Sequence, residues 1–140
     1  DLRVVPLRGN HVVLGNDEVA ANYLIRAPEG RKLFYAVDTG WPLDETWSAI
    51  RGQQIDVLIM DCTFGGMTDR PTHPDTHMDC NAFEEAVREM VRIGAVHEGS
   101  EIFATHIGPH QGLLHEELVE RFARTELPIT VAYDGLKTTL

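Results

Sequence analysis

Short runs of β-branched and aromatic residues alternate with longer amphipathic segments along the chain. Such short runs are typical of β-strands. They predict strands at residues 3–7, 21–26, 33–37, 57–60, 102–105, 129–133 and 136–140. The unbroken apolar sequences YAV and VLIM favour strands that are buried on both faces and covered by helices.

Two pairs of turn-forming residues predict how neighbouring strands are connected. Glu29-Gly30 separates the second and third runs, which predicts a hairpin there. Asp134-Gly135 separates the last two runs with the two-residue spacing of a type I′ turn, so we expect a second hairpin at the end of the chain.

Amphipathic periodicity predicts helices at residues 80–93 and 113–123, and a weaker one at 43–51. The apolar stripe of the first helix consists of Phe83, Val87, Met90 and Val91. Asp79 is suited to cap its amino end, and Gly94 to end it. The alternation of strands and helices predicts a single α/β domain.

The charge balance limits the partners of this chain. Its 140 residues include 12 basic and 22 acidic side chains, for a net charge of −10. This charge argues against a broad nucleic-acid-binding surface, which needs a basic face. It is compatible with a small phosphorylated substrate, since metal ions in a pocket can reverse the local field.

The sequence also bears on the cellular compartment. It has no apolar run of about 20 residues that could cross a bilayer, and its first residues do not resemble a secretion signal. The two cysteines, Cys62 and Cys80, match no zinc or redox spacing, so we expect free thiols in a cytoplasmic protein. Because the first residue is Asp1, we expect the chain to begin inside a longer polypeptide or after processing.

Two polar residues follow directly after predicted buried strands, where functional side chains gather in layered α/β folds. Asp38 follows YAV, and its two carboxylate oxygens could bridge two cations; the alternative is that it caps the following turn. His106 follows IFAT and is suited to metal ligation; the alternative is a hydrogen-bonded histidine at the end of a strand.

Two further histidines are candidates by position. His11 lies in the loop after the first strand, and a surface histidine is the alternative there. His77 precedes the helix predicted to start near Cys80, and helix amino ends attract anions such as phosphate. It could donate a proton to a leaving oxygen, or simply cap the helix. His73 and His110 compete with it for that role.

Taken in order, several stretches resemble the second half of the metallo-β-lactamase superfamily. They are PLRGNH, LFYAVDTG, DCTFGG, HMDCNAFEEAVREM, ATHIGPH and VAYDGL, which together span nearly all of the chain. The resemblance implies the second half of a four-layer αββα sandwich. The nearest branch is the one that holds phosphoribosyl cyclic phosphate phosphodiesterase and the tRNA 3′-end-processing endonucleases.

The resemblance also implies a set of site residues. In that superfamily the second half supplies a His, a bridging Asp and a final His, which correspond here to His11, Asp38 and His106. His11 would complete one metal site, His106 the other, and Asp38 would span both, with Zn²⁺ or Mn²⁺ as the two ions. His77 would act at the scissile phosphate. We therefore expect the tips of His11, Asp38 and His106 to meet at one sheet edge.

One motif of the superfamily does not occur in these residues. The first half of the fold supplies an HxHxDH sequence there, and this chain contains none. We therefore expect the chain to be the C-terminal half, inactive alone, with the N-terminal half of the same domain as its partner. A homodimer is a further partner that the sequence leaves open.

Two hypotheses about function follow. The complete protein would be a hydrolase that uses a two-metal hydroxide mechanism on a phosphodiester, with a small cyclic phosphodiester favoured. The alternative is a non-catalytic α/β module that binds a partner or a regulatory metal, in which Asp38 and His106 are ordinary turn and strand-end residues.

Overall fold

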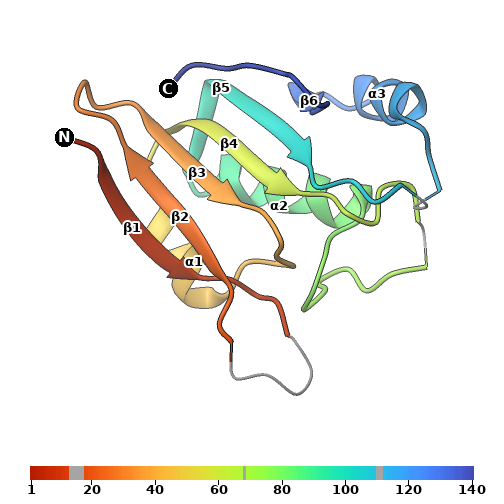
Figure 1. Cartoon of the computed structure of the whole chain (residues 1–140), viewed down its shortest axis with the longest axis horizontal. Coiled ribbons are helices and arrows are strands. Elements are labelled where there is room, and N and C mark those ends of the chain that lie inside the picture. The colour runs from red at the N-terminus through yellow and green to blue at the C-terminus, as the bar shows by residue number, and fades with distance from the viewer. Residues whose placement is uncertain (13–17, 68, 110–111) are drawn as a thin grey trace.

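The computed structural model describes residues 1–12, 18–67, 69–109 and 112–140. They form a six-stranded mixed sheet in the order β1-β2-β3-β4-β5-β6 (Figure 1). The strands are β1 (Arg3–Arg8), β2 (Ala21–Arg26), β3 (Lys32–Ala36), β4 (Ile55–Asp61), β5 (Val96–Thr105) and β6 (Ile129–Val131). The first three run antiparallel to one another, and β3 to β6 run parallel. The predicted α/β class is therefore confirmed.

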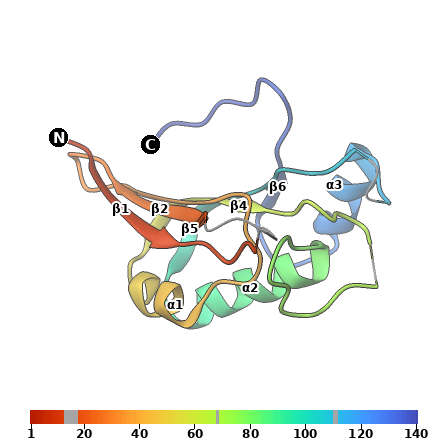
Figure 2. The same cartoon turned by 60° about the horizontal axis from the view of Figure 1, so that its bottom comes forward.

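Three helices accompany the sheet: α1 (Asp44–Ile50), α2 (Cys80–Arg92) and α3 (His115–Ala123). Helices α1 and α2 lie on one face of the sheet, and α3 lies beside β6 at its edge (Figure 2). The side chain of Asp79 accepts a hydrogen bond of 2.8 Å from the Ala82 amide, which confirms the predicted cap of α2. Gly94 follows α2 at φ +69°, a conformation that glycine adopts without strain.

The core lies between one face of the sheet and the helices, with α3 adding Leu118 and Phe122 next to α2. Its largest fully buried members are Phe34, Phe83, Phe122, Ile50, Ile55, Leu58 and Met60. The predicted stripe of α2 is confirmed for Phe83, Val87 and Met90. It is wrong for Val91, which is 52% exposed because it points away from the sheet.

The opposite face of the sheet carries no helix among the described residues. Strand register places the following apolar residues on this open face, of which Val57 is buried: Val4, Pro6, Tyr23, Ile25, Leu33, Tyr35, Val57 and Ile59. Tyr23 is 38% exposed and Tyr35 is 40% exposed. Burial on both faces is confirmed for VLIM, where Val57 and Leu58 point to opposite faces and are both buried, but not for YAV, where Tyr35 is exposed. The predicted cover of both faces by helices is wrong, since the described helices lie on one face.

The two predicted hairpins have different outcomes. The β2–β3 hairpin is confirmed, with Arg26 opposite Lys32 and Gly30 at φ +98° in the turn. The hairpin at the end of the chain is wrong. A turn does form, with the Leu136 amide bonded to the Tyr133 carbonyl, but residues 136–140 pair with no strand in the described part of the chain.

Side chains hold this final segment in place of a strand ladder. Arg31 donates a hydrogen bond to the Thr139 carbonyl, and Thr138 contacts Glu101. The segment runs across the side of the sheet that faces away from α1 and α2 (Figure 2).

Strand β5 starts earlier than predicted, at Val96 rather than residue 102. Its first half is the polar sequence VHEGSE, which carries no apolar alternation. A register shift between Ile55 and Val57 accommodates it, and the buried Ser100 hydroxyl donates to the Ile55 carbonyl at 2.7 Å. This bonding stabilises a stretch whose composition does not predict a strand.

Candidate metal centre

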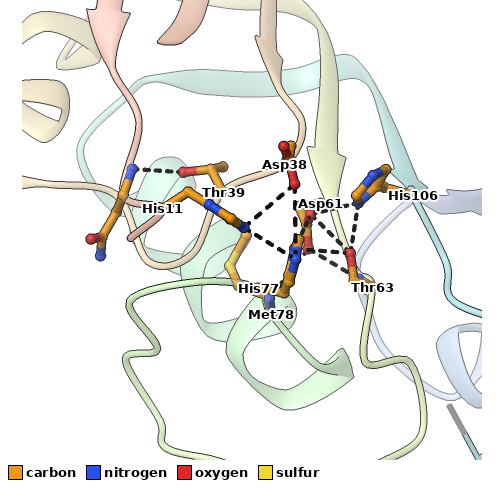
Figure 3. Close-up of polar contacts among 9 residues, drawn as sticks. His11, Asp38, Thr39, Asp61, Thr63, His77, Met78 and His106 are labelled. Carbon is orange, nitrogen blue, oxygen red and sulfur yellow. Dashed lines mark hydrogen bonds and ion pairs between the residues drawn. The ribbon is translucent and has the colours of Figure 1, made fainter. Parts of the chain in front are cut away.

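The carboxyl ends of β3, β4 and β5 meet at one edge of the sheet because these strands are parallel neighbours. Asp38 lies two residues beyond β3, Asp61 is the last residue of β4, and His106 follows β5 directly. Figure 3 shows their side chains converging with those of His11 and His77.

Two of these residues have an unusual backbone conformation. Asp38 and His106 both have φ near +59°, in the left-handed region that side chains with a Cβ disfavour. Such a conformation costs about 1–3 kcal/mol, and residues that adopt it cluster at functional sites. In this protein the conformation occurs just after β3 and β5, where the side chains of Asp38 and His106 point into the cluster (Figure 3).

Asp61 lies at the centre of the hydrogen-bond network and is completely buried. Its Oδ1 accepts hydrogen bonds from the backbone amides of Thr63, at 3.0 Å, and Met78, at 3.2 Å. Its Oδ2 lies 3.0 Å from His77 Nδ1 and 3.1 Å from His106 Nδ1. One carboxylate therefore orients two imidazole rings, since a carboxylate accepts and the facing ring nitrogens must donate.

The hydroxyl of Thr63 completes this network. Its Oγ1 lies 2.7 Å from His106 Nδ1, 3.1 Å from His77 Nδ1 and 3.0 Å from Asp61 Oδ2. The Nε2 atom of His77 faces the other way, 3.8 Å from Asp38 Oδ1.

His11 enters the cluster from the loop after β1. Its Nε2 lies 3.6 Å from Asp38 Oδ1 and 3.3 Å from His77 Nε2. The loop is held against the segment after β3, because the Asn10 amide donates to Thr39 Oγ1 at 2.9 Å and its side chain donates to the Trp41 carbonyl at 2.8 Å.

Close backbone packing positions the segment that carries His77. The Trp41 amide donates to the Pro74 carbonyl at 2.8 Å. A Cβ atom at Gly40 would lie 2.2 Å from that same carbonyl oxygen and 2.8 Å from the Thr76 nitrogen. Only glycine allows the two segments to approach this closely.

Four residues form a group that could hold a metal ion. Asp38, Asp61, His77 and His106 each offer a ligand atom, and these atoms lie within 4.8 Å of one another. Imidazole nitrogens and carboxylate oxygens are ligands that suit Zn²⁺ and Mn²⁺. The buried Asp61 also supplies the hydrogen bonds that metal-binding histidines require from their surroundings.

The structure brings all four predicted site residues together. The expected convergence of His11, Asp38 and His106 is seen, although His11 lies outside the four-residue group and contacts it through Asp38 and His77. Sequence reasoning missed Asp61. The signal for it was present, because a carboxylate at the end of the apolar run VLIM follows the same pattern as Asp38 after YAV.

The other histidines lie elsewhere or cannot be placed. His73 stacks on Trp41, with ring centroids 3.9 Å apart, and contacts Glu85 at 3.3 Å. His115 packs edge-on against Tyr133 at 6.0 Å. His110, named above as a competitor of His77, lies outside the described residues.

The two cysteines lie beneath the cluster. Cys62 and Cys80 are buried and unbridged, with sulfur atoms 3.9 Å apart. Hydrogen bonding to Cys80, and then burial, raise the pKa of the Cys62 thiol well above its ordinary value. Hydrogen bonding to Cys62 lowers the pKa of Cys80. The pair lies at the amino end of α2, of which Cys80 is the first residue. Neither cysteine contributes a ligand atom to the four-residue group.

No protein-family model matches the sequence, and a search of curated proteins finds no match. Solved structures do share the fold. A crystal structure of a possible metal-dependent hydrolase from Veillonella parvula matches 99% of this chain with a TM-score of 0.67 at 18% identity. Unliganded yeast PDE1 matches 96% with a TM-score of 0.65 at 13% identity. The chain spans about half of each, 54% and 44% of their lengths.

No helix in the described part of the chain combines the length and apolar character needed to cross a membrane.

Proposed function

We propose that this chain is the C-terminal half of a metal-dependent hydrolase that cleaves a phosphodiester bond. The observation that carries the proposal is the convergence of two carboxylates and three imidazoles at one sheet edge, those of Asp38, Asp61, His77, His106 and His11. The fold shared with a possible metal-dependent hydrolase and with yeast PDE1 supports it.

The donor set fits divalent metal ions. His106, Asp38 and His11 would hold them, with Asp38 between the two, and Zn²⁺ or Mn²⁺ is the proposed identity. When bound, such ions supply a water nucleophile of lowered pKa and positive charge for the phosphoryl oxygens.

His77 would move the proton in this reaction. Asp61 faces Nδ1 of His77 at 3.0 Å, which leaves Nε2 directed toward Asp38 and His11. With Nδ1–H donating to Asp61, the ring in its doubly protonated form can give the proton on Nε2 to a leaving oxygen and so become neutral. His77 also lies three residues before α2, whose amino end favours a negatively charged group.

A small cyclic phosphodiester is the proposed substrate class. The chain carries a net charge of −10, so a long nucleic acid would be repelled outside the immediate metal centre. A small diester needs favourable charge only at the metals and His77.

The N-terminal half would dock on the open face of the sheet. This face presents apolar side chains from β1 to β4, including the partly exposed Tyr23 and Tyr35. Both matching structures are about twice as long as this chain. A second sheet packed there would give the four-layer αββα sandwich, and its HxHxDH motif would supply the remaining metal ligands.

The proposal is tested with the complete polypeptide and bis-p-nitrophenyl phosphate, beside a small cyclic phosphodiester. We expect hydrolysis that stops when a chelator removes the metal and returns with Zn²⁺ or Mn²⁺. Asp38→Asn should reduce both metal content and rate, because it removes the charge shared by both ions. Unchanged hydrolysis after complete metal removal would contradict the proposal.

A further inference from the structure

A cavity of about 240 Å³ lies at the end of the sheet opposite the metal centre. It is bounded by the first three strands and by α1, and no residue of the metal centre lines it. Its apolar wall consists of Val5, Leu7, Leu24 and Ala49. Val5, Leu7 and Leu24 point toward the helix-covered side but are only half-buried, because the short helix α1 does not cover them fully.

Three cations form the rim of this cavity: Arg3, Arg26 and Lys32, here called the basic row. Arg3 lies directly opposite Arg26 in the β1–β2 pair, and Arg26 lies directly opposite Lys32 in the β2–β3 pair. Like charges placed directly opposite each other destabilise a sheet. The chain has only 12 basic residues against 22 acidic ones, so three adjacent cations are an unexpected concentration.

Among the described residues, no carboxylate forms an ion pair with a side chain of the basic row. Neither the arginines nor Lys32 form an ion pair within 4.0 Å there, and Lys32 donates its side-chain bond to the neutral Gln53 carbonyl. The carboxylate of Asp56 accepts from the Lys32 backbone amide at 2.7 Å and lies 3.9 Å from Arg31 and 3.7 Å from His97. The positive charge therefore faces the cavity without an internal partner.

We propose that this cavity binds a small organic anion with an apolar body, such as a medium-chain carboxylate or an alkyl phosphate. The basic row would hold the anionic group and relieve its own repulsion. The apolar body would cover the half-buried surface of Val5, Leu7 and Leu24. This site is independent of the proposed hydrolytic function, because Lys32 lies at the amino end of β3 whereas the metal centre lies beyond the carboxyl ends of β3, β4 and β5.

The test uses the full 140-residue chain, with calorimetry and ¹H–¹⁵N chemical shifts at low salt, where Coulomb attraction is least screened. Octanoate and octyl phosphate probe the two anionic groups. Acetate lacks the apolar body, and 1-octanol lacks the charge. We expect at least one of the octyl anions to bind and to shift the amides of Val5, Leu24 and Ala49. Acetate and 1-octanol should bind at least tenfold more weakly.

Two variants locate the site by different means. Arg26→Gln removes the central charge of the basic row, and Ala49→Leu fills the apolar part without changing charge. Each should weaken binding of the octyl anion at least tenfold. The matched control is Arg124→Gln, an exposed arginine 3.5 Å from Glu120 on α3, which should leave the affinity unchanged.

Stability separates a binding role from a structural one. Because the row is repulsive without ligand, Arg26→Gln should leave the melting temperature of the free chain unchanged or raise it at low salt. A clear fall in melting temperature would mean that Arg26 stabilises the fold and would overturn the proposal. So would failure of both octyl anions to bind, equal binding of 1-octanol, or affinity unaffected by both variants.

Discussion

Asp61 connects the two histidines of the candidate metal centre to the main chain. It has no exposed surface, and each of its oxygens is engaged, one by backbone amides and the other by imidazoles. A carboxylate in this position orients its neighbours more than it meets a substrate. The proposed function gives the two rings that it orients different roles, proton transfer for His77 and metal binding for His106. Removing each ring should therefore have a different effect on metal content.

The first prediction contrasts those two residues. In the complete protein, His77→Ala should leave metal content intact and lower turnover by about 10²–10⁴-fold, the usual effect of losing a positioned acid–base group. His106→Ala should lose metal and activity together. Metal analysis beside kinetics on bis-p-nitrophenyl phosphate checks this. If His77→Ala releases metal, then His77 is a ligand and the proposed role moves to another residue.

The second prediction concerns Gly40. Gly40→Ala should destabilise the fold by about 1–3 kcal/mol, because the added methyl group would meet the Pro74 carbonyl and the Thr76 amide, which are backbone atoms. Denaturant unfolding measures the change. Gly99→Ala is the control, since its Cβ would meet only the side chain of His97. Equal effects of the two substitutions would show that the close approach at Gly40 is unimportant.

At the level of elements, the helices differ in how their amino ends are capped. Helix α2 has a side-chain cap in Asp79. Helix α3 has half of a capping box, because Glu117 accepts from the Leu114 amide at 2.7 Å but the leucine side chain offers no acceptor. Its first backbone amides therefore lack a side-chain partner at this position.

The third prediction uses this difference. Leu114→Ser should stabilise the fold by about 1 kcal/mol, since serine completes the capping box with Glu117. Little burial is lost, because Leu114 is 70% exposed. Thermal unfolding measures the gain. Val119→Ser, at a 45% exposed position inside α3, is the control and should give no gain. A gain in the control alone would contradict the capping argument.

At the scale of the whole molecule, one side of the sheet is packed and the other is open. The packed side carries the core formed with all three helices, while the open side carries a set of partly exposed apolar residues. The metal centre lies at the edge that both sides share. Under the proposed function, the remaining metal ligands would come from the unit that packs against the open side.

The fourth prediction follows from that asymmetry. Titration of the isolated 140 residues with Zn²⁺ should show weak or substoichiometric binding, since this chain alone leaves each of two ions short of a filled ligand shell. Calorimetry with a competing chelator measures the affinity, and His106→Ala should abolish what binding remains. Tight binding of two ions by this chain alone would contradict the half-enzyme proposal.

The sequence by itself determined much of the fold. Apolar runs and amphipathic periods located six of the seven predicted strands and all three helices, because those patterns are local consequences of burial. Asp38 and His106 were also predicted from a local pattern, because each is a polar residue directly after an apolar strand. The strand predicted at residues 136–140 from their β-branched and apolar composition does not form. Hydrogen bonds from the Arg31 side chain and to the Glu101 side chain hold this segment instead of a neighbouring strand.

Only the tertiary structure decided how the site is assembled. The register of parallel neighbours brings the ends of β3, β4 and β5 together and makes Asp61 the common partner of His77 and His106. Close packing at Gly40 then sets where the His77 segment lies. The hydrogen bonds of the site join residues up to 66 positions apart, and no local pattern encodes them, since each depends on which strands become neighbours.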